Sequence, residues 1–381
     1  ERDPCGAVIN AVTTSARRPL RADASCDGVS ADDTDRRSVI QRLAERRARH
    51  SRGDSGCTIV DNDAYTHSEP PAVSVVVTLY DYATYIQECL DSVITSDPVP
   101  GGHEIVVVDD ASTDQSSAVV ESVMAAAHIP IRLVKKTLNT GLADARNTGL
   151  EMARGRAVFI LDADNWVYPS CLRSLFQVLA QGACAAVYPI IRKFSDQTGE
   201  PLGLLSARAW DVRSLIRGPY IDAMAMFDRG VLLSVGGYST ELIEHGWFGW
   251  EDYDLWLKLA RTQQRCENVP SVLASYRVHP TSMLHRTNRS WENIAAYLRV
   301  KFRDLTAQYP DLDCHFGLPT INGLFASSSD VHFNNDEIYQ QFGELQRQLK
   351  DVYASKSWRI TRPLPWFYEV LTNWKMASHS G

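Results

Sequence analysis

The pattern of hydrophobic and polar positions changes near residue 71. Residues 1–70 contain many Arg and Asp residues, no Lys and few large apolar residues. Within them, the run TDRRSVIQRLAERRARHS can form one short helix with a thin apolar stripe. We therefore predict that residues 1–70 are a polar N-terminal extension that is flexible or loosely docked. A basic arm that contacts a partner is the alternative, although the interleaved Asp residues weaken it.

From residue 71 onwards, continuous apolar runs alternate with segments of helical spacing. The runs AVSVVVTL, EIVVVDD, IRLVKK and AVFILDAD have the length and the β-branched content of buried strands. Between them, apolar residues recur at steps of three and four, which is typical of helices. This alternation predicts an α/β fold with a Rossmann-like, mostly parallel sheet covered by helices on both faces. We assign this domain to residues 71–290.

A helical pattern without strands follows from residue 291. The segments NIAAYLRVKFRDLTAQY and NDEIYQQFGELQRQLKDVYA each predict an amphipathic helix. Residues 291–381 are therefore expected to form a helical C-terminal region. Its last segment, PLPWFYEVLTNWKM, is aromatic and could make a peripheral membrane contact. Docking of this tail onto the main domain is the favoured interpretation.

Composition narrows the class of protein. The chain has a net charge of −7 and 44% hydrophobic residues, as in an ordinary globular protein. Nucleic acid is not an expected partner, because that would require a basic face. The eight cysteines are scattered, which favours free thiols in a reducing compartment over a disulfide framework. We expect a cytoplasmic location, at the inner face of the cell membrane if the tail docks there.

Polar residues follow three of the predicted strands at the points where the strands end. In parallel α/β sheets, ligands bind beyond the carboxyl ends of the strands. We therefore expect three clusters to converge at one edge and form a site. They are Thr78 to Asp81, Asp109 to Ser112, and Asp162 to Asn165.

The pair Asp162 and Asp164 carries the most specific chemistry. Two carboxylates with one residue between them on an extended segment point the same way and repel each other unless a cation lies near. Carboxylate oxygens favour Mg²⁺ or Mn²⁺, and Mg²⁺ commonly completes its shell with water and substrate phosphates. The pair therefore indicates a metal ion that holds a diphosphate. Two solvated loop aspartates are the alternative.

The other strand ends suggest contacts with a nucleoside. Asp109 and Asp110 could accept a hydrogen bond from a base or a ribose hydroxyl. The alternative is that Asp110 and Ser112 form a turn and cap the next helix. Tyr80 could stack on a nucleobase or lie in the core. Arg146, on the helix before the Asp162 strand, could balance phosphate or hold the aspartates.

Four motifs in order carry a family resemblance. They are VSVVVTLYDYATYIQECLDSV, EIVVVDDASTD, NTGLADARNTGLEMARGRAVFILDADN and GWEDYDLWLKL. Together, over residues 73–285, they resemble the inverting family 2 of nucleotide-sugar glycosyltransferases, which has the GT-A fold. Weaker similarity of the segment SKSWRITRPLPWF indicates enzymes that build bacterial cell-surface polysaccharides.

The resemblance implies roles for particular residues. Tyr80 and Asp110 look like nucleoside contacts, with Asp109 adjacent. Asp162 looks like a ribose or metal contact, and Asp164 looks like the direct metal ligand. The first strand end departs from the family pattern, because it reads Thr78-Leu79-Tyr80-Asp81 where P-x-Y-N is common.

A late histidine often joins the metal in this family. His279 resembles that histidine, and His285 is its rival. An exposed loop histidine without a ligand is the alternative for His279.

The E-D motif of the family supplies the catalytic base. Here it is Glu251-Asp252, before an apolar helix face. We expect Asp252 to be the base and Glu251 to orient the acceptor, while helix capping alone is the other interpretation. Trp247, Trp250 and Trp256 could stack on sugar faces or belong to the core.

The leading hypothesis is therefore a metal-dependent inverting glycosyltransferase of polysaccharide or glycoconjugate synthesis, with Mn²⁺ or Mg²⁺ as cofactor. The expected donor is a nucleotide-diphosphate sugar, a UDP-sugar first, and the acceptor a carbohydrate or lipid-linked glycan. A nucleotidyltransferase is an alternative, but the segment TLYDYATY lacks the glycines of a phosphate loop. A catalytically inactive nucleotide-sugar-binding module is another, which the retained acidic residues disfavour.

Overall fold

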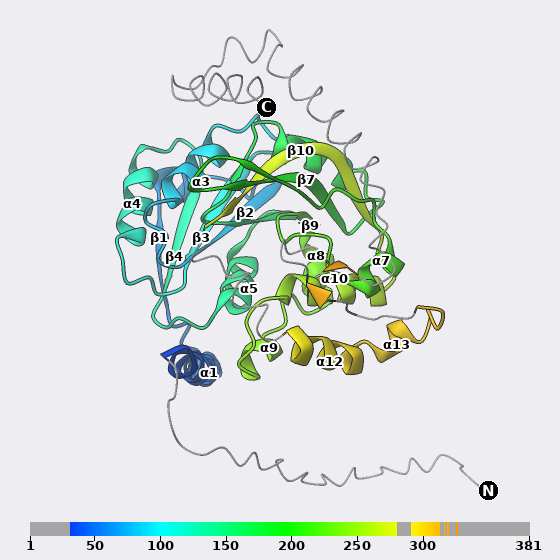
Figure 1. The fold of residues 1–381 in the computed structure, drawn as a ribbon. Helices are drawn as coiled ribbons and strands as arrows, with labels where there is room; N and C mark the ends of the chain where they lie inside the picture. The colour runs from blue at the N-terminus through cyan, green and yellow to red at the C-terminus, as the bar shows by residue number, and fades with distance from the viewer. Residues whose placement is uncertain (1–30, 280–290, 313–315, 317, 320–324, 327–381) are drawn as a thin grey trace, which may run out of the picture.

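The computed structural model describes residues 31–279, 291–312, 316, 318–319 and 325–326. One large mixed sheet runs through the domain in the order β1-β4-β3-β2-β5-β9-β7-β10-β6, with β8 beside β7 (Figure 1). Its strands are β1 Cys57–Asp61, β2 Val73–Leu79, β3 His103–Asp109, β4 Ile131–Lys136, β5 Ala157–Asp162, β6 Trp166–Val167, β7 Ala186–Ser195, β8 Pro201–Leu205, β9 Met226–Asp228 and β10 Cys266–Val278. A separate small pair consists of β11 Leu318–Pro319 and β12 Phe325–Ala326.

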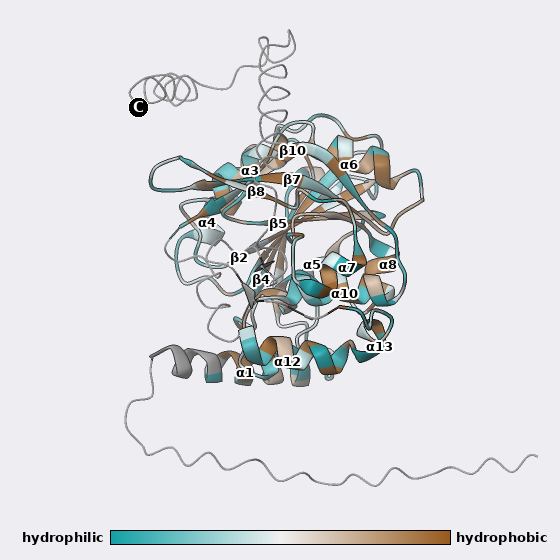
Figure 2. Cartoon of the chain, turned by 45° about the vertical axis from the view of Figure 1, so that its right-hand side comes forward, coloured by the Kyte–Doolittle hydropathy of each residue, from teal (hydrophilic) through white to brown (hydrophobic). Residues whose placement is uncertain are grey.

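The helices cover both faces of this sheet. They are α1 Ala31–His50, α2 Asp63–Thr66, α3 Ile86–Ile94, α4 Ser116–Ala126, α5 Leu142–Met152, α6 Cys171–Leu179, α7 Val212–Arg217, α8 Arg229–Ser234, α9 Glu241–Glu244, α10 Glu251–Arg261, α12 Trp291–Lys301 and α13 Arg303–Thr306. Helices α3, α4 and α6 pack on one face, and α5, α7, α8 and α10 pack on the other (Figures 1 and 2). The predicted α/β fold, with a sheet covered on both faces, is confirmed.

The burial of the central strand β2 explains why most of its residues are apolar. All seven of its residues are buried. Val75 and Val77 belong to the hydrophobic cluster under α3 and α4, whereas Val76 belongs to the cluster under α5. Because successive side chains point to opposite faces and both faces are covered, its two polar residues are buried with hydrogen-bond partners, Ser74 with Glu104 and Thr78 with Asp162.

The core strands of the sheet pair in parallel, with an antiparallel strand inserted in the middle. Strands β4, β3, β2 and β5 are parallel neighbours, and β7 and β10 form a second parallel pair. The short strand β9 lies between β5 and β7 and runs antiparallel to both. The segment before β9 consequently lies at the edge where β5 ends.

The second half of the expected N-terminal extension differs from the prediction, because residues 31–70 pack onto the domain. Strand β1 pairs with β4 at the edge of the sheet. Helix α1 buries Val39 and Leu43 in the same cluster as α5. Arg46 forms an ion pair with Asp144 at 2.7 Å. The thin apolar stripe of α1 is sufficient to dock the helix on the domain, because polar contacts flank the stripe. Residues 1–30 lie outside the described part.

The C-terminal prediction is only partly within the described residues. The expected helix over residues 293–309 is divided into α12 and α13 at Phe302, whose side chain is buried. The second expected helix and the aromatic tail lie outside the described residues. Among the helices that the structure describes, none is long and apolar enough to cross a membrane.

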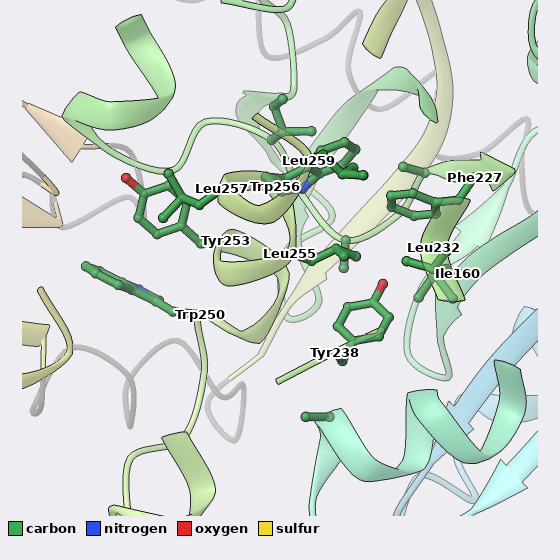
Figure 3. Close-up of a cluster of buried hydrophobic side chains, with 14 of the residues drawn as sticks. Ile160, Phe227, Leu232, Tyr238, Trp250, Tyr253, Leu255, Trp256, Leu257 and Leu259 are labelled. Atoms are coloured by element: carbon green, nitrogen blue, oxygen red, sulfur yellow. The ribbon is translucent and has the colours of Figure 1, made fainter. Parts of the chain in front are cut away.

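Helix α10 is buried on nearly all sides, as Figure 3 shows. Trp256 lies against Phe227 of β9, with ring centroids 5.2 Å apart. Trp256 is therefore a core residue and not a sugar platform. Trp250 is also buried and packs edge-on against Tyr253, whereas Trp247 is partly exposed and stacks on His245.

Candidate active site

The carboxyl ends of β2 and β5 meet at one edge of the sheet. Thr78 and Asp162 are partners in the parallel register of these strands. The Thr78 hydroxyl donates a hydrogen bond of 3.1 Å to Asp162 Oδ1. The register thus brings two of the predicted donor-site residues into contact.

Arg146 joins this edge to helix α10. Its side chain, on α5, is only 2% exposed. Nη2 donates to Asp162 Oδ1 at 2.9 Å, and Nη1 donates to Glu251 Oε1 at 2.8 Å. One guanidinium therefore connects the carboxylates that end β5 and begin α10. In a buried position, such charge-assisted pairs fix the relative positions of their elements.

Asp164 lies beside His279, as the candidate metal site requires. His279 Nε2 is 3.0 Å from Asp164 Oδ2. The imidazole is 2% exposed and packs against the rings of Tyr82 and Tyr85, which excludes an exposed loop histidine. Burial raises the pKa of Asp164 above its ordinary value. His285 lies outside the described residues.

Arg277 holds the backbone that carries Asp164. Its Nε donates to the Asp164 carbonyl at 2.9 Å, and its guanidinium forms an ion pair of 2.5 Å with Glu88 of α3. The Tyr85 ring packs against the guanidinium at 4.5 Å. Asp164 and His279 are therefore held by the same end of β10.

The donor atoms at this edge fit a hard divalent ion. Asp164 and His279 would hold it, with Asp162 adjacent. In the described part of the chain, no group of three or more metal-ligating side chains is drawn together. Two protein ligands are enough where phosphates and water complete the shell, and Mn²⁺ accepts both oxygen and imidazole ligands.

Glu251 and Asp252 begin helix α10 beside this edge. The residue before them, Trp250, has φ +62°, a left-handed conformation that is uncommon for a bulky residue. Burial raises the pKa of both carboxyls above their ordinary values, while the Arg146 charge lowers it. The Asp252 Oδ1 atom accepts a hydrogen bond from the Tyr253 amide at 2.7 Å.

Asp109 and Asp110 have different surroundings from each other. Asp109 accepts hydrogen bonds from the Ser112 amide, at 2.8 Å, and from the Ser117 hydroxyl of α4. Asp109, and not Asp110, thus closes the turn at Ser112, and its bond to α4 goes to a hydroxyl and not to a backbone amide. Asp110 forms a buried ion pair with Lys136 at 2.5 Å and accepts from the Gly141 amide at 2.9 Å. Both residues are buried, and their carboxylate oxygens already accept hydrogen bonds within the protein. A nucleoside could contact them only in addition to these bonds.

Tyr80 projects from the end of β2 and is 43% exposed, so it is not a core residue. The next residue, Asp81, has φ +55° and accepts a hydrogen bond from the Thr113 amide at 2.6 Å. This contact joins the loop after β2 to the loop after β3. An exposed ring at the edge can stack on a planar ligand.

The structure places two further residues, Asp222 and Tyr276, near the candidate site, and no sequence motif indicated them. Asp222 interacts electrostatically with Asp162 and Asp164, and the Tyr276 hydroxyl interacts with all three carboxylates. Neither residue lies in a recognisable motif. Only the antiparallel course of β9 and the position of β10 place them here.

The fold and the carboxylates at the strand ends define an α/β transferase domain of the GT-A type. Residues 74–235 match the model of "Glycosyl transferase family 2". This segment runs from β2 to α8, so the first part of the α/β domain is similar to that family.

Two curated relatives show the same similarity. The chain is 33% identical over 109 residues to "Glycosyltransferase GlyA" of Streptococcus pneumoniae, a match covering 29% of this chain and 15% of that protein. It is 38% identical over 121 residues to "Succinoglycan biosynthesis protein ExoO" of Rhizobium meliloti, covering 31% and 32% respectively. The matches thus span less than two-thirds of each relative's length.

Among solved structures, the chain is similar to the mannosyltransferase PcManGT of Pyrobaculum calidifontis, which was solved in complex with GDP-Man and Mn²⁺. The sequences are 21% identical, the alignment covers 92% of both chains, and the TM-score is 0.48.

Proposed function

We propose that this protein is a metal-dependent inverting glycosyltransferase that moves a sugar from a nucleotide-diphosphate donor to an acceptor hydroxyl. The observation that carries the proposal is the Asp162–Arg146–Glu251 bridge, in a domain similar to this family. It holds the candidate diphosphate site and the candidate base at one edge of the sheet.

Excess negative charge at this edge supports the need for a cation. Burial, and after it repulsion from neighbouring carboxylates, raises the pKa of Asp164, Glu251 and Asp252, while the guanidinium of Arg146 is shared between Asp162 and Glu251. A nucleoside diphosphate would add further negative charge. A divalent ion held by Asp164 and His279 would stabilise the charge of the departing diphosphate when bound.

Asp252 is the proposed general base. The acceptor hydroxyl oxygen attacks C1 of the sugar as the bond between C1 and the diphosphate oxygen breaks. The hydroxyl proton passes to the Asp252 carboxylate. Glu251 is committed to Arg146, which leaves Asp252 as the carboxylate of this pair without an arginine partner among the described residues.

The donor and acceptor classes are part of the same proposal. We propose a UDP-sugar as donor, and a carbohydrate or lipid-linked glycan as acceptor. The names of the two relatives support a role in polysaccharide or glycoconjugate synthesis. A membrane contact through the C-terminal tail stays a prediction.

The first test removes the proposed metal ligand. Asp164→Ala should abolish Mn²⁺-dependent binding of UDP or GDP while the protein stays folded, because the side chain lies at an edge. Calorimetric titration with each nucleotide, with and without Mn²⁺, measures the effect. Asp228→Ala is the matched control, because Asp228 pairs with the opposite end of β5. Equal metal-dependent affinity in Asp164→Ala and the control would refute the assignment.

A further inference from the structure

The course of β9 brings a third acidic segment to the site. Ala157 pairs with Asp228, and Phe159 pairs with Met226, in an antiparallel register. The Ile160 amide donates to the Ala225 carbonyl at 3.1 Å, so the pairing continues towards the end of β5. Asp222 lies three residues before Ala225, so it belongs to the segment that leads into β9 at the end of β5, where Asp162 and Asp164 lie.

The Asp222 side chain is held on one side only. Its amide donates to the Ser206 hydroxyl at 2.9 Å, and its Oδ1 accepts from the Met224 amide at 2.9 Å. The side chain is partly exposed, and among the described residues its recorded side-chain hydrogen bond reaches Oδ1 and not Oδ2. One carboxylate oxygen is therefore fixed by the turn and the other is open to the edge.

Asp222 interacts with both poles of the site. Its charge interacts with Asp162 and Asp164, at the pole proposed for the diphosphate. It also interacts with Asp252, the proposed base. In an in-line transfer, the sugar must lie between these poles, because C1 is bonded to the diphosphate and is attacked from the side of the base.

We propose that Asp222 is a specificity-determining residue that accepts a hydrogen bond from a hydroxyl or amide N–H group of the donor sugar. This inference rests on the proposed function and adds to it the group that recognises the sugar. A carboxylate makes a stronger hydrogen bond to such a donor than a neutral acceptor does. Asp222 would then recognise the sugar through its polar substituents, while other residues bind the nucleotide.

The experiment compares nucleotide sugars with nucleotides. Asp222→Asn keeps an oxygen for the Met224 amide, so the turn is retained, and Asp222→Ala removes the whole group. Kd values are measured with Mn²⁺ for UDP, GDP, UDP-glucose, UDP-GlcNAc and GDP-mannose. We expect the best-bound nucleotide sugar to lose roughly 10-fold affinity or more in Asp222→Ala, and less in Asp222→Asn. The Kd of the free nucleotide should change by less than about threefold. Asp228→Asn, at the far end of β9, should change neither value.

The outcomes separate this inference from the proposed function. If the wild-type protein binds none of these probes, the proposed function is refuted. If it binds a nucleotide sugar and both Asp222 variants bind it equally well, only the role of Asp222 is refuted. A role in the sugar contact is also overturned if free nucleotide loses as much affinity as the nucleotide sugar.

Discussion

At the residue scale, Arg146 decides how the acidic residues divide their roles. Its guanidinium is buried and pairs with both Asp162 and Glu251. Removing one partner of such a buried pair leaves an uncompensated charge, which is costly. A change at Glu251 would therefore disturb Asp162 as well, and it should affect donor binding in addition to the acceptor.

Asp252→Asn should separate catalysis from binding. The amide keeps the shape of the side chain but cannot take a proton, so kcat should fall by roughly 10²–10⁴ while the donor KM changes little. The base works when deprotonated, and burial raises its pKa. Activity of the wild type should therefore be lost as the pH falls through a value above about 3.9, the ordinary pKa of Asp. Steady-state rates across pH measure both effects.

The matched variant is Glu251→Gln, which should raise the donor Kd because Arg146 loses a charged partner. If Glu251→Gln is inactive and Asp252→Asn keeps a near-normal kcat, the two roles are reversed. If both variants remain active, the motif only caps helix α10, and the base is another group.

At the element scale, helix α1 and strand β1 are parts of the fold. Leu43 is 1% exposed and lies in the cluster that contains α5. Strand β1 pairs with β4 over five residues and covers an edge that would otherwise be open. Removing residues 1–65 deletes both elements, so the truncated chain should be less stable and prone to edge-to-edge association.

Leu43→Ala tests the docking of α1 without a truncation. Loss of a buried leucine side chain should reduce the free energy of unfolding by about 2–5 kcal/mol. Val300→Ala, at a position 65% exposed on α12, is the control and should stay within about 0.5 kcal/mol. Urea denaturation measures both. Equal stabilities would mean that α1 is loosely docked, as its sequence alone suggests.

The elements that the sequence predicted well are those with strong local patterns. Strands β2, β3 and β5 are buried on both faces, so their mostly apolar runs were clear. Strand β9 has only three residues, and its place between β5 and β7 depends on long-range pairing. The edge of the site was predictable because parallel strands end together, whereas Asp222 reaches that edge only through the antiparallel strand. The docking of α1 depended on a partner surface that its own sequence does not show.

At the scale of the whole molecule, an ion pair connects helix α12 to helix α10, which carries the proposed base. Asp254, two residues after the proposed base, has a side chain that is 0% exposed and lies 2.7 Å from Lys301 Nζ of α12. Lys301 also donates to the Ser239 hydroxyl at 2.9 Å. Lys258 lies 3.4 Å from the same carboxylate. Helix α12 therefore positions α10 although it lies outside the segment that matches the family.

Lys301→Met should loosen this connection. The buried Asp254 carboxylate would keep only Lys258 as a cationic partner, so we expect a loss of about 1–3 kcal/mol of stability. Because α10 carries the proposed base, kcat should fall while the Kd for UDP with Mn²⁺ stays unchanged. Lys301→Arg, which keeps the positive charge, should retain most of the stability and most of the kcat of the wild type. Thermal denaturation and steady-state kinetics measure these effects, and an unchanged kcat in Lys301→Met would show that α12 does not position the base.

The burial of α10 has a consequence for motion. A helix whose residues are mostly buried, and which contacts α7 and α13, has few exposed backbone groups, so it cannot open by a small local fluctuation. Its opening free energy should approach that of global unfolding. The base is then among the least mobile parts of the molecule, and its orientation exists before any substrate arrives. Adjustment on binding must therefore come from the loops at the strand ends and from the acceptor itself.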